Sequence, residues 1–298
     1  MNERDWLADR FQEHRQHLQS VAYRMLGSMS EAEDALQDAW LRVSPTDASG
    51  VENMRAWLTT VVGRVCLNTL RSRGARREDH SIHVPDPVVS FDASVDPEEE
   101  VLLADSVGLA LLVVLDSLAP AERLAFVLHD MFAVPFEDIA RLLDRSPMAA
   151  RQLASRARRR VQGSPAPDSD LALQREVVDA FFLASRDGDF DALLAVLDPD
   201  VELRIDGGVL RAEASLAIRG AAAVAAHSST YSRLYPFVRP AFVNGTAGAV
   251  VVPGGQPFSV LAFTVTNAKI AAIDALVDPE RLAQLDLTPL PPANADEA

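Results

Sequence analysis

A dense run of basic residues lies near the middle of the chain. Between Arg151 and Arg160 the sequence holds five arginines and no acidic residue. Ser146 and Pro147, just before this run, are typical of a helix start, because serine caps free amides and proline suits the first turn. Arginine donates paired hydrogen bonds to guanine and glutamine pairs with adenine, so such a helix could contact bases in a DNA major groove.

A shorter helix is predicted directly before the basic one. Apolar residues of Phe136–Leu143 recur at helical spacing, and Asp144 with Arg145 interrupts the pattern. Asp144 stands where many such turns have glycine, but aspartate tolerates a left-handed backbone conformation. The two helices together predict a helix-turn-helix. The residues expected on its outward face are Arg151, Gln152, Ser155, Arg156 and Arg159.

A second basic segment lies earlier in the chain. Six arginines and no acidic residue occur between Met54 and Arg77. Trp57 and Asn68 are interleaved with them, and basic charge beside stacking groups suits melted, single-stranded DNA. Taken alone, the segment could be an ordinary solvated helix face. Two such segments within an acidic chain favour nucleic acid as the partner of both.

The overall composition limits where such contacts can occur. The chain has 298 residues, with 28 Lys and Arg against 43 Asp and Glu, and a net charge of -15. A DNA site must therefore be a local basic patch. At 48% hydrophobic residues the chain can bury real cores, and its length suits two domains or three small ones. Its one cysteine, Cys66, excludes an internal disulfide and a cysteine-built zinc site.

The hydropathy pattern gives no sign of a membrane segment. No stretch approaches the roughly 18 consecutive apolar residues of a membrane helix. The first residues also lack a basic segment that leads into an apolar run. We therefore expect no membrane span, no secretory signal and a cytoplasmic location.

Two segments rich in proline, glycine, serine and acidic residues divide the chain. They are Glu78–Glu100 and Gly163–Asp170, and both have the composition of linkers. Helical spacing is typical of the parts before and between them. The predicted domains are residues 1–77, 101–162 and 171–287, with linkers at 78–100 and 163–170 and a flexible tail at 288–298.

Helices are followed by strands in the third domain. Glu176–Ser185 and Phe190–Leu197 have helical patterns, and short apolar runs bounded by turn residues come after them. This order indicates an α+β domain. The predicted strands are Val201–Ile205, Ala241–Asn244, Ala247–Val252, Phe258–Thr266 and Lys269–Ala275.

A helix with one apolar and one acidic face is predicted in the first domain. Ser30 and Glu33 have capping-box spacing, which places the helix start at Ser30. Apolar residues up to Val43 share one face, and acidic residues share another. Such an acidic face fits a basic protein surface.

Three segments carry a family resemblance. They are AEDALQDAWLRV at Ala32–Val43, RAWLTTVVGRVCLNTLRSR at Arg55–Arg73, and a stretch at Leu118–Val161 that includes FEDIARLLDRSPMAARQLASRARRRV. In this order they resemble the extracytoplasmic-function sigma factors of bacterial RNA polymerase. The first two are similar to the region-two domain and the third to the region-four domain.

The last domain resembles a different, fused module. Leu171–Leu287 is similar to a SnoaL-like domain, which is a cone with a curved antiparallel sheet and an internal pocket. The resemblance implies two all-α sigma domains, a helical bundle and a helix-turn-helix, followed by an α+β SnoaL-like cone.

Sigma factors with this extension carry three short motifs, and the chain keeps part of each. Trp-Leu-Pro-Glu-Pro corresponds to His83–Pro87, Asp-Gly-Gly-Gly-Lys to Asp206–Leu210, and Asn-Pro-Asp-Lys to Asp278–Arg281. The resemblance implies that the extension contacts the linker and the region-two side through them. The expected regulatory contacts are Pro85, Asp86, Pro87, Asp206, Gly207, Gly208, Asp278, Pro279 and Arg281.

The resemblance also implies partners for three helical surfaces. The acidic helix would bind the clamp helices of the largest polymerase subunit, and the two basic segments would bind the minus-ten and minus-thirty-five promoter elements. The polymerase flap is a further expected partner. The expected residues are Glu33, Asp34, Gln37, Asp38 and Trp40 for core polymerase, Arg64, Asn68 and Arg71 for the minus-ten element, and the outward residues of the helix-turn-helix for the minus-thirty-five element.

The implied function is that of an alternative sigma factor. It would bind core RNA polymerase and direct promoter-specific initiation, with its activity controlled in cis by the SnoaL-like domain. No cofactor, metal or catalytic residue is expected, and an unidentified small ligand of the pocket is a further candidate partner.

Two other functions remain open at this point. One is a ligand-responsive helix-turn-helix transcription factor that binds duplex operator DNA without polymerase. The other is a SnoaL-type cyclase or isomerase fused to DNA-binding helices. Its candidate acids and bases would be Asp206, His227, Tyr231 and Asp274.

Overall fold

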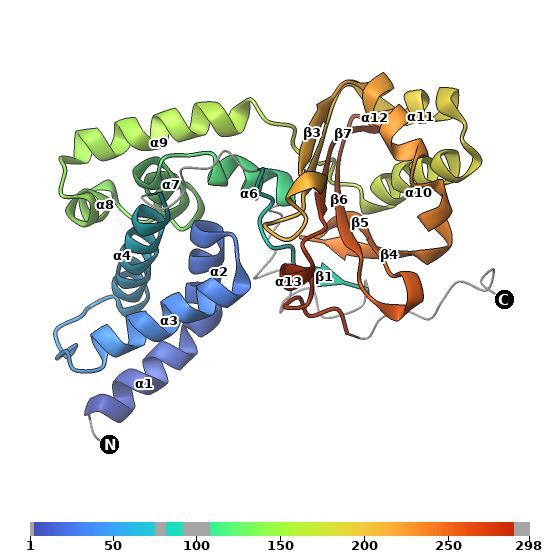
Figure 1. Ribbon diagram of the computed structural model, residues 1–298. Coiled ribbons are helices and arrows are strands. Elements are labelled where there is room, and N and C mark those ends of the chain that lie inside the picture. The colour runs from blue at the N-terminus through green and yellow to red at the C-terminus, as the bar shows by residue number, and fades with distance from the viewer. Residues whose placement is uncertain (1–2, 75–81, 92–107, 289–298) are drawn as a thin grey trace. The chain divides into compact units, whose positions relative to one another are not determined.

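The computed structural model describes residues 3–74, 82–91 and 108–288, which form two compact units (Figure 1). The first unit contains residues 3–74 and 114–163. The second contains residues 82–91, 108–113 and 164–288. Residues 82–91 of the predicted first linker therefore belong to the C-terminal unit.

Some sequence predictions fall outside the described ranges. They concern Arg77, the acidic end of the first linker and most of the tail. Within the described ranges, no helix combines the length and the hydropathy that a membrane span requires.

The N-terminal helices of the first unit surround one central helix. The elements are α1 (Glu3–Glu13), α2 (Arg15–Leu26), α3 (Met29–Val43) and α4 (Met54–Gly74). α4 contacts α2 and α3, and it also contacts two helices from further along the chain, α7 (Pro120–Phe126) and α8 (Phe136–Leu143). Because it is enclosed on several sides, its buried residues, among them Leu58, Val62 and Cys66, do not form one narrow stripe.

The start of α3 corrects one prediction. The N-cap is Ser28, whose extended backbone precedes the helix and whose Oγ accepts the Glu31 amide at 3.5 Å. Ser28 also has a glutamate three residues later, so the capping-box pattern occurs twice in this short stretch. The prediction that Ser30 caps the helix was therefore wrong, because the helix is capped by the earlier of the two serines, Ser28.

The helix-turn-helix prediction is confirmed. The helices that follow are α6 (Leu109–Asp116), α7 (Pro120–Phe126), a π-helical turn (Val127–Met131), α8 (Phe136–Leu143) and α9 (Pro147–Gln162), and the division between the units falls within α6. Asp144, between α8 and α9, has a left-handed backbone with φ 53° and ψ 52°. Ser146 caps α9, since its Oγ accepts the Ala149 amide at 3.2 Å.

A single sheet organises the second unit. Its order is β1-β4-β5-β6-β7-β2-β3. Strands β4 to β7 form successive antiparallel hairpins, and β2 then joins the end of this series parallel to β7. The expected antiparallel sheet is therefore a mixed one. The bounds are β1 (Val89–Ser90), β2 (Leu197–Asp206), β3 (Leu216–Arg219), β4 (Val238–Val243), β5 (Thr246–Val251), β6 (Ser259–Thr266) and β7 (Lys269–Leu276).

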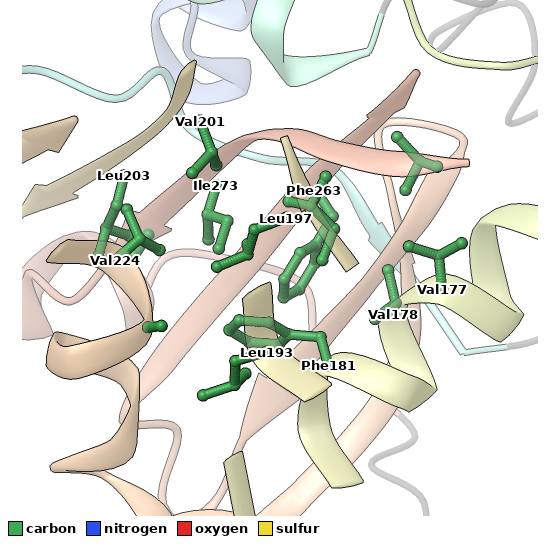
Figure 2. Close-up of a cluster of buried hydrophobic side chains, with 14 of the residues drawn as sticks. Val177, Val178, Phe181, Leu193, Leu197, Val201, Leu203, Val224, Phe263 and Ile273 are labelled. Carbon is green, nitrogen blue, oxygen red and sulfur yellow. The ribbon is translucent and has the colours of Figure 1, made fainter. Parts of the chain in front are cut away.

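The core of the second unit lies between its helices and one face of the sheet (Figure 2). Val178, Leu193 and Val224 come from three helices, and Phe263 with Ile273 comes from the sheet. Burying each such side chain contributes roughly 1.5–3 kcal/mol. The helices are α10 (Leu171–Asp187), α11 (Phe190–Val196), α12 (Ala221–Ser229) and the short α13 (Pro279–Leu282).

Candidate polymerase, promoter and linker contacts

The solvent-facing side of α9 is basic. Alanines at positions 150, 154 and 157 form its buried stripe, which lets the helix approach its neighbours closely. All of the predicted minus-thirty-five residues lie on the exposed side. They are Arg151, Gln152, Ser155, Arg156 and Arg159.

The arginines of α9 differ in their partners. Arg151 lies 3.3 Å from the Glu137 carboxylate, and Arg158 pairs with Asp130. Arg156 and Arg159 have no acidic partner among the described residues. Since no ion pair has to be broken, these two could contact DNA at the least cost.

The predicted minus-ten residues form one row on α4. Arg64, Asn68 and Arg71 are all exposed and follow one another at intervals of four and three residues. Residues at these intervals lie on the same helix face. The row therefore offers two guanidinium groups and an amide along one line.

The predicted core-polymerase residues of α3 divide into two groups. Glu33 is half-buried and pairs with Arg15. Trp40 packs edge-on against Phe11, with ring centroids 5.4 Å apart. These two therefore also stabilise the helical bundle. The freely exposed members are Asp34, Gln37 and Asp38.

One residue on this surface was missed by the sequence analysis. Leu41 is 68% exposed, although it is a large apolar side chain. It continues the row of Asp34, Gln37 and Asp38 at helical spacing, which is the signal that could have identified it. The exposed face of α3 thus combines acidic groups with one apolar side chain, that of Leu41.

Helices of the first two predicted domains pack together inside the first unit. A Cβ on Gly63 of α4 would lie 3.0 Å from Leu128. Arg123 of α7 is 1% exposed; its Nε donates to the Arg24 carbonyl at 3.2 Å and its Nη1 to Asp116 at 3.0 Å. The two predicted domains therefore share one tightly packed interior.

A half-buried histidine borders this interior. His17 of α2 contacts the Thr59 hydroxyl through Nε2 at 2.8 Å, and its Nδ1 accepts from Arg55 at 2.9 Å. Its ring also packs edge-on against Phe132. Burial, followed by the nearby charge of Arg55, lowers the pKa of His17 to about 4.

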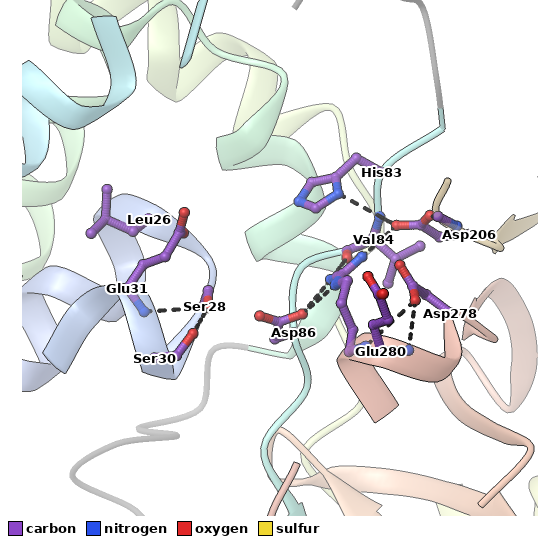
Figure 3. A network of polar contacts seen from close by, with 12 residues as sticks. Leu26, Ser28, Ser30, Glu31, His83, Val84, Asp86, Asp206, Asp278 and Glu280 are labelled. Atoms are coloured by element: carbon purple, nitrogen blue, oxygen red, sulfur yellow. Dashed lines mark hydrogen bonds and ion pairs between the residues drawn. The ribbon is translucent and has the colours of Figure 1, made fainter. Parts of the chain in front are cut away.

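In the second unit, Asp206 binds the linker. The Val84 amide donates to Asp206 Oδ2 at 2.9 Å, and His83 Nδ1 lies 3.4 Å from the same oxygen (Figure 3). The other oxygen accepts the Gly208 amide at 2.9 Å. Burial alone would raise the pKa of Asp206, yet these hydrogen bonds and the charge of Arg281 outweigh it, so its pKa lies well below the ordinary value.

Arg281 completes this contact from α13. Its Nη1 donates to Asp206 Oδ2 at 2.7 Å and its Nε to Asp86 Oδ1 at 2.6 Å, while Nη2 donates to the Val84 carbonyl. Asp278 caps α13 by accepting the Glu280 amide at 2.9 Å, which fixes the direction in which Arg281 leaves the helix. We call the contacts of Asp206 and Arg281 with residues 83–86 the linker clasp.

Two glycines allow the clasp to close. Gly208 has φ +61°, and a Cβ there would lie 1.8 Å from Asp278 Oδ2. A Cβ on Gly207 would lie 2.0 Å from the Arg211 carbonyl oxygen. A side chain at Gly207 would therefore overlap the backbone of Arg211, and one at Gly208 would displace the Asp278 side chain that caps α13.

The linker is also held by backbone pairing. The Val88 amide donates to Asn244 Oδ1 at 3.1 Å, and the Asn244 amide donates to the Val88 carbonyl at 2.8 Å. Directly after this contact, β1 pairs with the edge of β4, with Val89 opposite Val243. Pro85 and Pro87, the remaining linker residues named above, are both buried.

The candidate acids and bases of an enzyme do not come together. His227 and Tyr231 line a cavity in the core of the second unit, but Asp206 lies in the clasp. Asp274 receives two hydrogen bonds from Arg204, at 2.6 and 3.2 Å. Side chains alternate along a strand, so Ile273 faces the cavity while Asp274 faces the opposite side of the sheet.

Comparison with known proteins places this arrangement in a family. The family model described as Sigma-70 region 2 matches residues 10–76, and the model described as Sigma-70, region 4 matches residues 108–161. The extracytoplasmic-function RNA polymerase sigma factor SigJ of Mycobacterium tuberculosis is 39% identical, over 91% of this chain and 91% of its own length. The probable sigma factor SigI of the same species is 36% identical, over 96% and 98%.

A solved structure extends the similarity to the C-terminal unit. The crystal structure of Mycobacterium tuberculosis SigJ aligns with a TM-score of 0.76 at 34% sequence identity, and it covers 94% of this chain and 100% of its own. The second unit has the helices and curved sheet expected for a SnoaL-like domain (Figure 1). The chain belongs to the extracytoplasmic-function sigma factors of bacterial RNA polymerase, with a SnoaL-like domain at its C-terminal end.

Proposed function

We propose that this sigma factor initiates transcription through three helix faces and that its SnoaL-like domain restrains it through the linker clasp. The face of α3 binds core polymerase, the row on α4 binds the minus-ten element, and the face of α9 binds the minus-thirty-five element. The observation that carries the proposal is the clasp itself, because it ties the segment between regions two and four to the C-terminal domain.

The electrostatics support the assignment of the three faces. α3 presents Asp34 and Asp38 to solvent, and acidic groups speed association with a basic protein surface. Arg156 and Arg159 on α9 are unpaired within the described residues, so they can neutralise phosphates or donate to guanine. In an otherwise acidic chain such local patches determine where DNA binds.

The restraint has a direct physical basis. A sigma factor must place two domains on promoter elements that lie far apart, so the segment between those domains has to be free to extend. In the clasp this segment is fixed by buried, charge-assisted hydrogen bonds and by strand pairing. Polymerase therefore competes with the clasp for the linker, and because the restraining domain is covalently attached, its effective concentration is high.

The family acts by binding and not by catalysis, and we extend this to the SnoaL-like domain. The described residues that line its cavity include no carboxylate. An acid–base mechanism at that place would lack the acidic partner that His227 or Tyr231 would need. Action on core polymerase also fits the expected cytoplasmic location.

Run-off transcription with purified core polymerase tests the proposal. The full chain and its Arg281→Gln variant are compared on a library of promoter DNA, with Arg219→Gln as the control, since Arg219 is an exposed residue outside the clasp. Core-dependent, promoter-specific transcripts are expected, in greater yield for Arg281→Gln. Duplex DNA binding without any effect of core polymerase would instead favour a free-standing transcription factor.

A further inference from the structure

A partly open cavity lies within the SnoaL-like domain. Its volume is about 240 Å³, which is the space of roughly eight liquid water molecules. Phe181 on α10 and Leu203, Phe263 and Ile273 on the sheet form part of its wall (Figure 2). The wall is mainly apolar, so the cavity suits an organic molecule better than water.

Two polar atoms in the wall have no hydrogen-bond partner. They are Ser185 Oγ on α10 and His227 Nε2 on α12, and both atoms are buried. Ser185 as a whole is 8% exposed. A buried polar atom without a partner costs about 1–3 kcal/mol. A ligand that supplies the missing hydrogen bonds would recover this cost on binding.

The charge of the wall limits the ligand further. Arg211 is the charged residue among the described lining residues. Its Nη1 donates to the Val277 carbonyl at 3.1 Å, and its guanidinium lies over the Phe258 ring, 5.2 Å from the centroid. Burial lowers the pKa of His227, which favours its neutral imidazole. A cation would therefore meet the positive charge of Arg211 and find no carboxylate among the described lining residues.

We propose that the cavity binds a small, mainly apolar molecule without a positive charge, and that a hydroxyl or carbonyl group of this molecule bonds to Ser185 Oγ and His227 Nε2. A hydroxyl satisfies both atoms, because it can donate to one and accept from the other. A carbonyl group can only accept, so it would take a hydrogen bond from the Ser185 hydroxyl or from a protonated His227 Nε2.

The wall of the cavity is continuous with the linker clasp. Ile205 lines the cavity, and the next residue is Asp206. Val277 also lines it and is followed by Asp278, the cap of α13. A ligand that pushes these strand ends apart acts on both sides of the clasp. This consequence rests on the proposed function, whereas ligand binding itself does not.

Three probes that share a ring system test the binding. 2-Naphthol is apolar with one hydroxyl, naphthalene lacks the hydroxyl, and 2-naphthylmethylammonium carries a positive charge. Each is titrated into the full chain and followed by calorimetry or ligand-observed NMR. We expect 2-naphthol to bind at one site and more tightly than naphthalene, and 2-naphthylmethylammonium to bind most weakly.

Substitutions place the binding in the cavity. Ser185→Ala and His227→Phe should each weaken 2-naphthol about five- to tenfold and leave naphthalene unchanged. Because the Ser185 hydroxyl is unsatisfied, Ser185→Ala should not lower the midpoint of urea unfolding. Ser229→Ala is the control on α12, the helix of His227, since the Ser229 hydroxyl bonds to the Ala225 carbonyl and Ser229 is not among the lining residues.

The results can overturn the proposal directly. Failure of 2-naphthol to bind, preference for 2-naphthylmethylammonium, or equal weakening by Ser229→Ala would each contradict it. Amide hydrogen exchange at Val84 and Val88 then tests the connection to the clasp, and faster exchange with 2-naphthol bound is expected. Unchanged exchange would mean that the ligand binds without acting on the clasp. Basal run-off transcription, measured without probe, tests the sigma function independently.

Discussion

The Arg281 guanidinium donates to Asp206 Oδ2 at 2.7 Å, although 75 residues separate the two in sequence. Asp206 ends the parallel partner of β7, and Arg281 lies on the helix that follows β7, so the sheet brings them together. Both side chains are largely buried, with exposed fractions of 4% and 18%. The same pair holds the backbone of Val84, which makes it the centre of the clasp.

Removing one member of this pair should lower the free energy of unfolding. Asp206→Asn leaves Arg281 without a charged partner on one side and should lower the free energy of unfolding by about 3 kcal/mol at neutral pH. Because the pKa of Asp206 lies well below its ordinary value, this stability is present above about pH 4 and is lost as the pH falls further. Urea unfolding from pH 7 to pH 3 should show the two proteins converging. A constant difference across that range would contradict the assignment.

A glycine substitution tests the close approach inside the clasp. Gly208→Ala should lower the free energy of unfolding by about 2–4 kcal/mol, because its Cβ would overlap Asp278 and its φ is +61°. Gly254→Ala is the matched control, since Gly254 has the same φ of +61° and nothing within 4 Å of an added Cβ. Its cost should be about 1 kcal/mol. Equal costs, measured by urea unfolding, would mean that backbone strain alone is responsible.

Acid should loosen the packing of regions two and four through His17. Its pKa is lowered from 6.5 to about 4, so the folded protein binds fewer protons than the unfolded chain between these values. Stability is therefore lost as the pH falls from 6.5 to 4, by about 1–2 kcal/mol once solvent screening is considered. His17→Gln should flatten this part of the profile in urea unfolding. A profile that is the same in both proteins would exclude His17 as the cause.

The apolar residue on α3 should matter for polymerase and not for folding. Leu41→Ser removes a contact that is 68% exposed, so the free energy of unfolding should change by less than about 0.5 kcal/mol. Affinity for core polymerase should fall about tenfold, as for a contact near the centre of an interface. Leu210→Ser, at a site that is 59% exposed, is the control. Equal affinity for both variants, measured by surface plasmon resonance, would remove Leu41 from the surface.

The arginines on α9 without an acidic partner among the described residues should help the protein to distinguish one promoter from another. Arg156→Ala and Arg159→Ala should each reduce transcription from promoters with an intact minus-thirty-five element about five- to fiftyfold, the range of a lost base or phosphate contact. Arg10→Ala removes the same charge from α1 and should have little effect. Run-off assays on wild-type and scrambled elements provide the measurement. Equal losses on both templates would indicate phosphate contacts without base recognition.

Local signals in the sequence predicted the helix-turn-helix well. The turn has a left-handed residue at Asp144, and the next helix has its cap at Ser146 and its first position at Pro147. Because these three residues lie within three positions of one another, local sequence alone specifies the geometry. At the start of α3 the same kind of signal was ambiguous, because Ser28 and Ser30 both precede a glutamate by three residues.

Contacts between distant segments were harder to derive. Spacing did not indicate that β2 runs parallel to β7 or that a two-residue strand, β1, pairs with β4, because register depends on the whole sheet. The alanine-rich α12 and the short β3 have little periodicity and were not predicted. Motif resemblance pointed to Asp206 and Arg281 as contacts, but only the structure shows that both bond to the backbone of Val84. Ser185 was missed, since one serine on a helix has no distinguishing pattern.

A reversible lock on the linker tests the central claim most directly. Val89 and Val243 are opposite each other across β1 and β4, so cysteines at both positions are close enough for a disulfide. The native Cys66 is buried and its pKa is raised to about 12 by that burial, so it should not exchange with the new pair.

The measurement is run-off transcription by the Val89→Cys, Val243→Cys protein with core polymerase, oxidised and then reduced. The single variant Val89→Cys, treated in the same way, controls for oxidation. We predict little transcription from the oxidised protein and full recovery on reduction, because the linker cannot leave the clasp while the disulfide is closed. Equal transcription before and after reduction would show that polymerase accepts the clasped linker and would contradict the account.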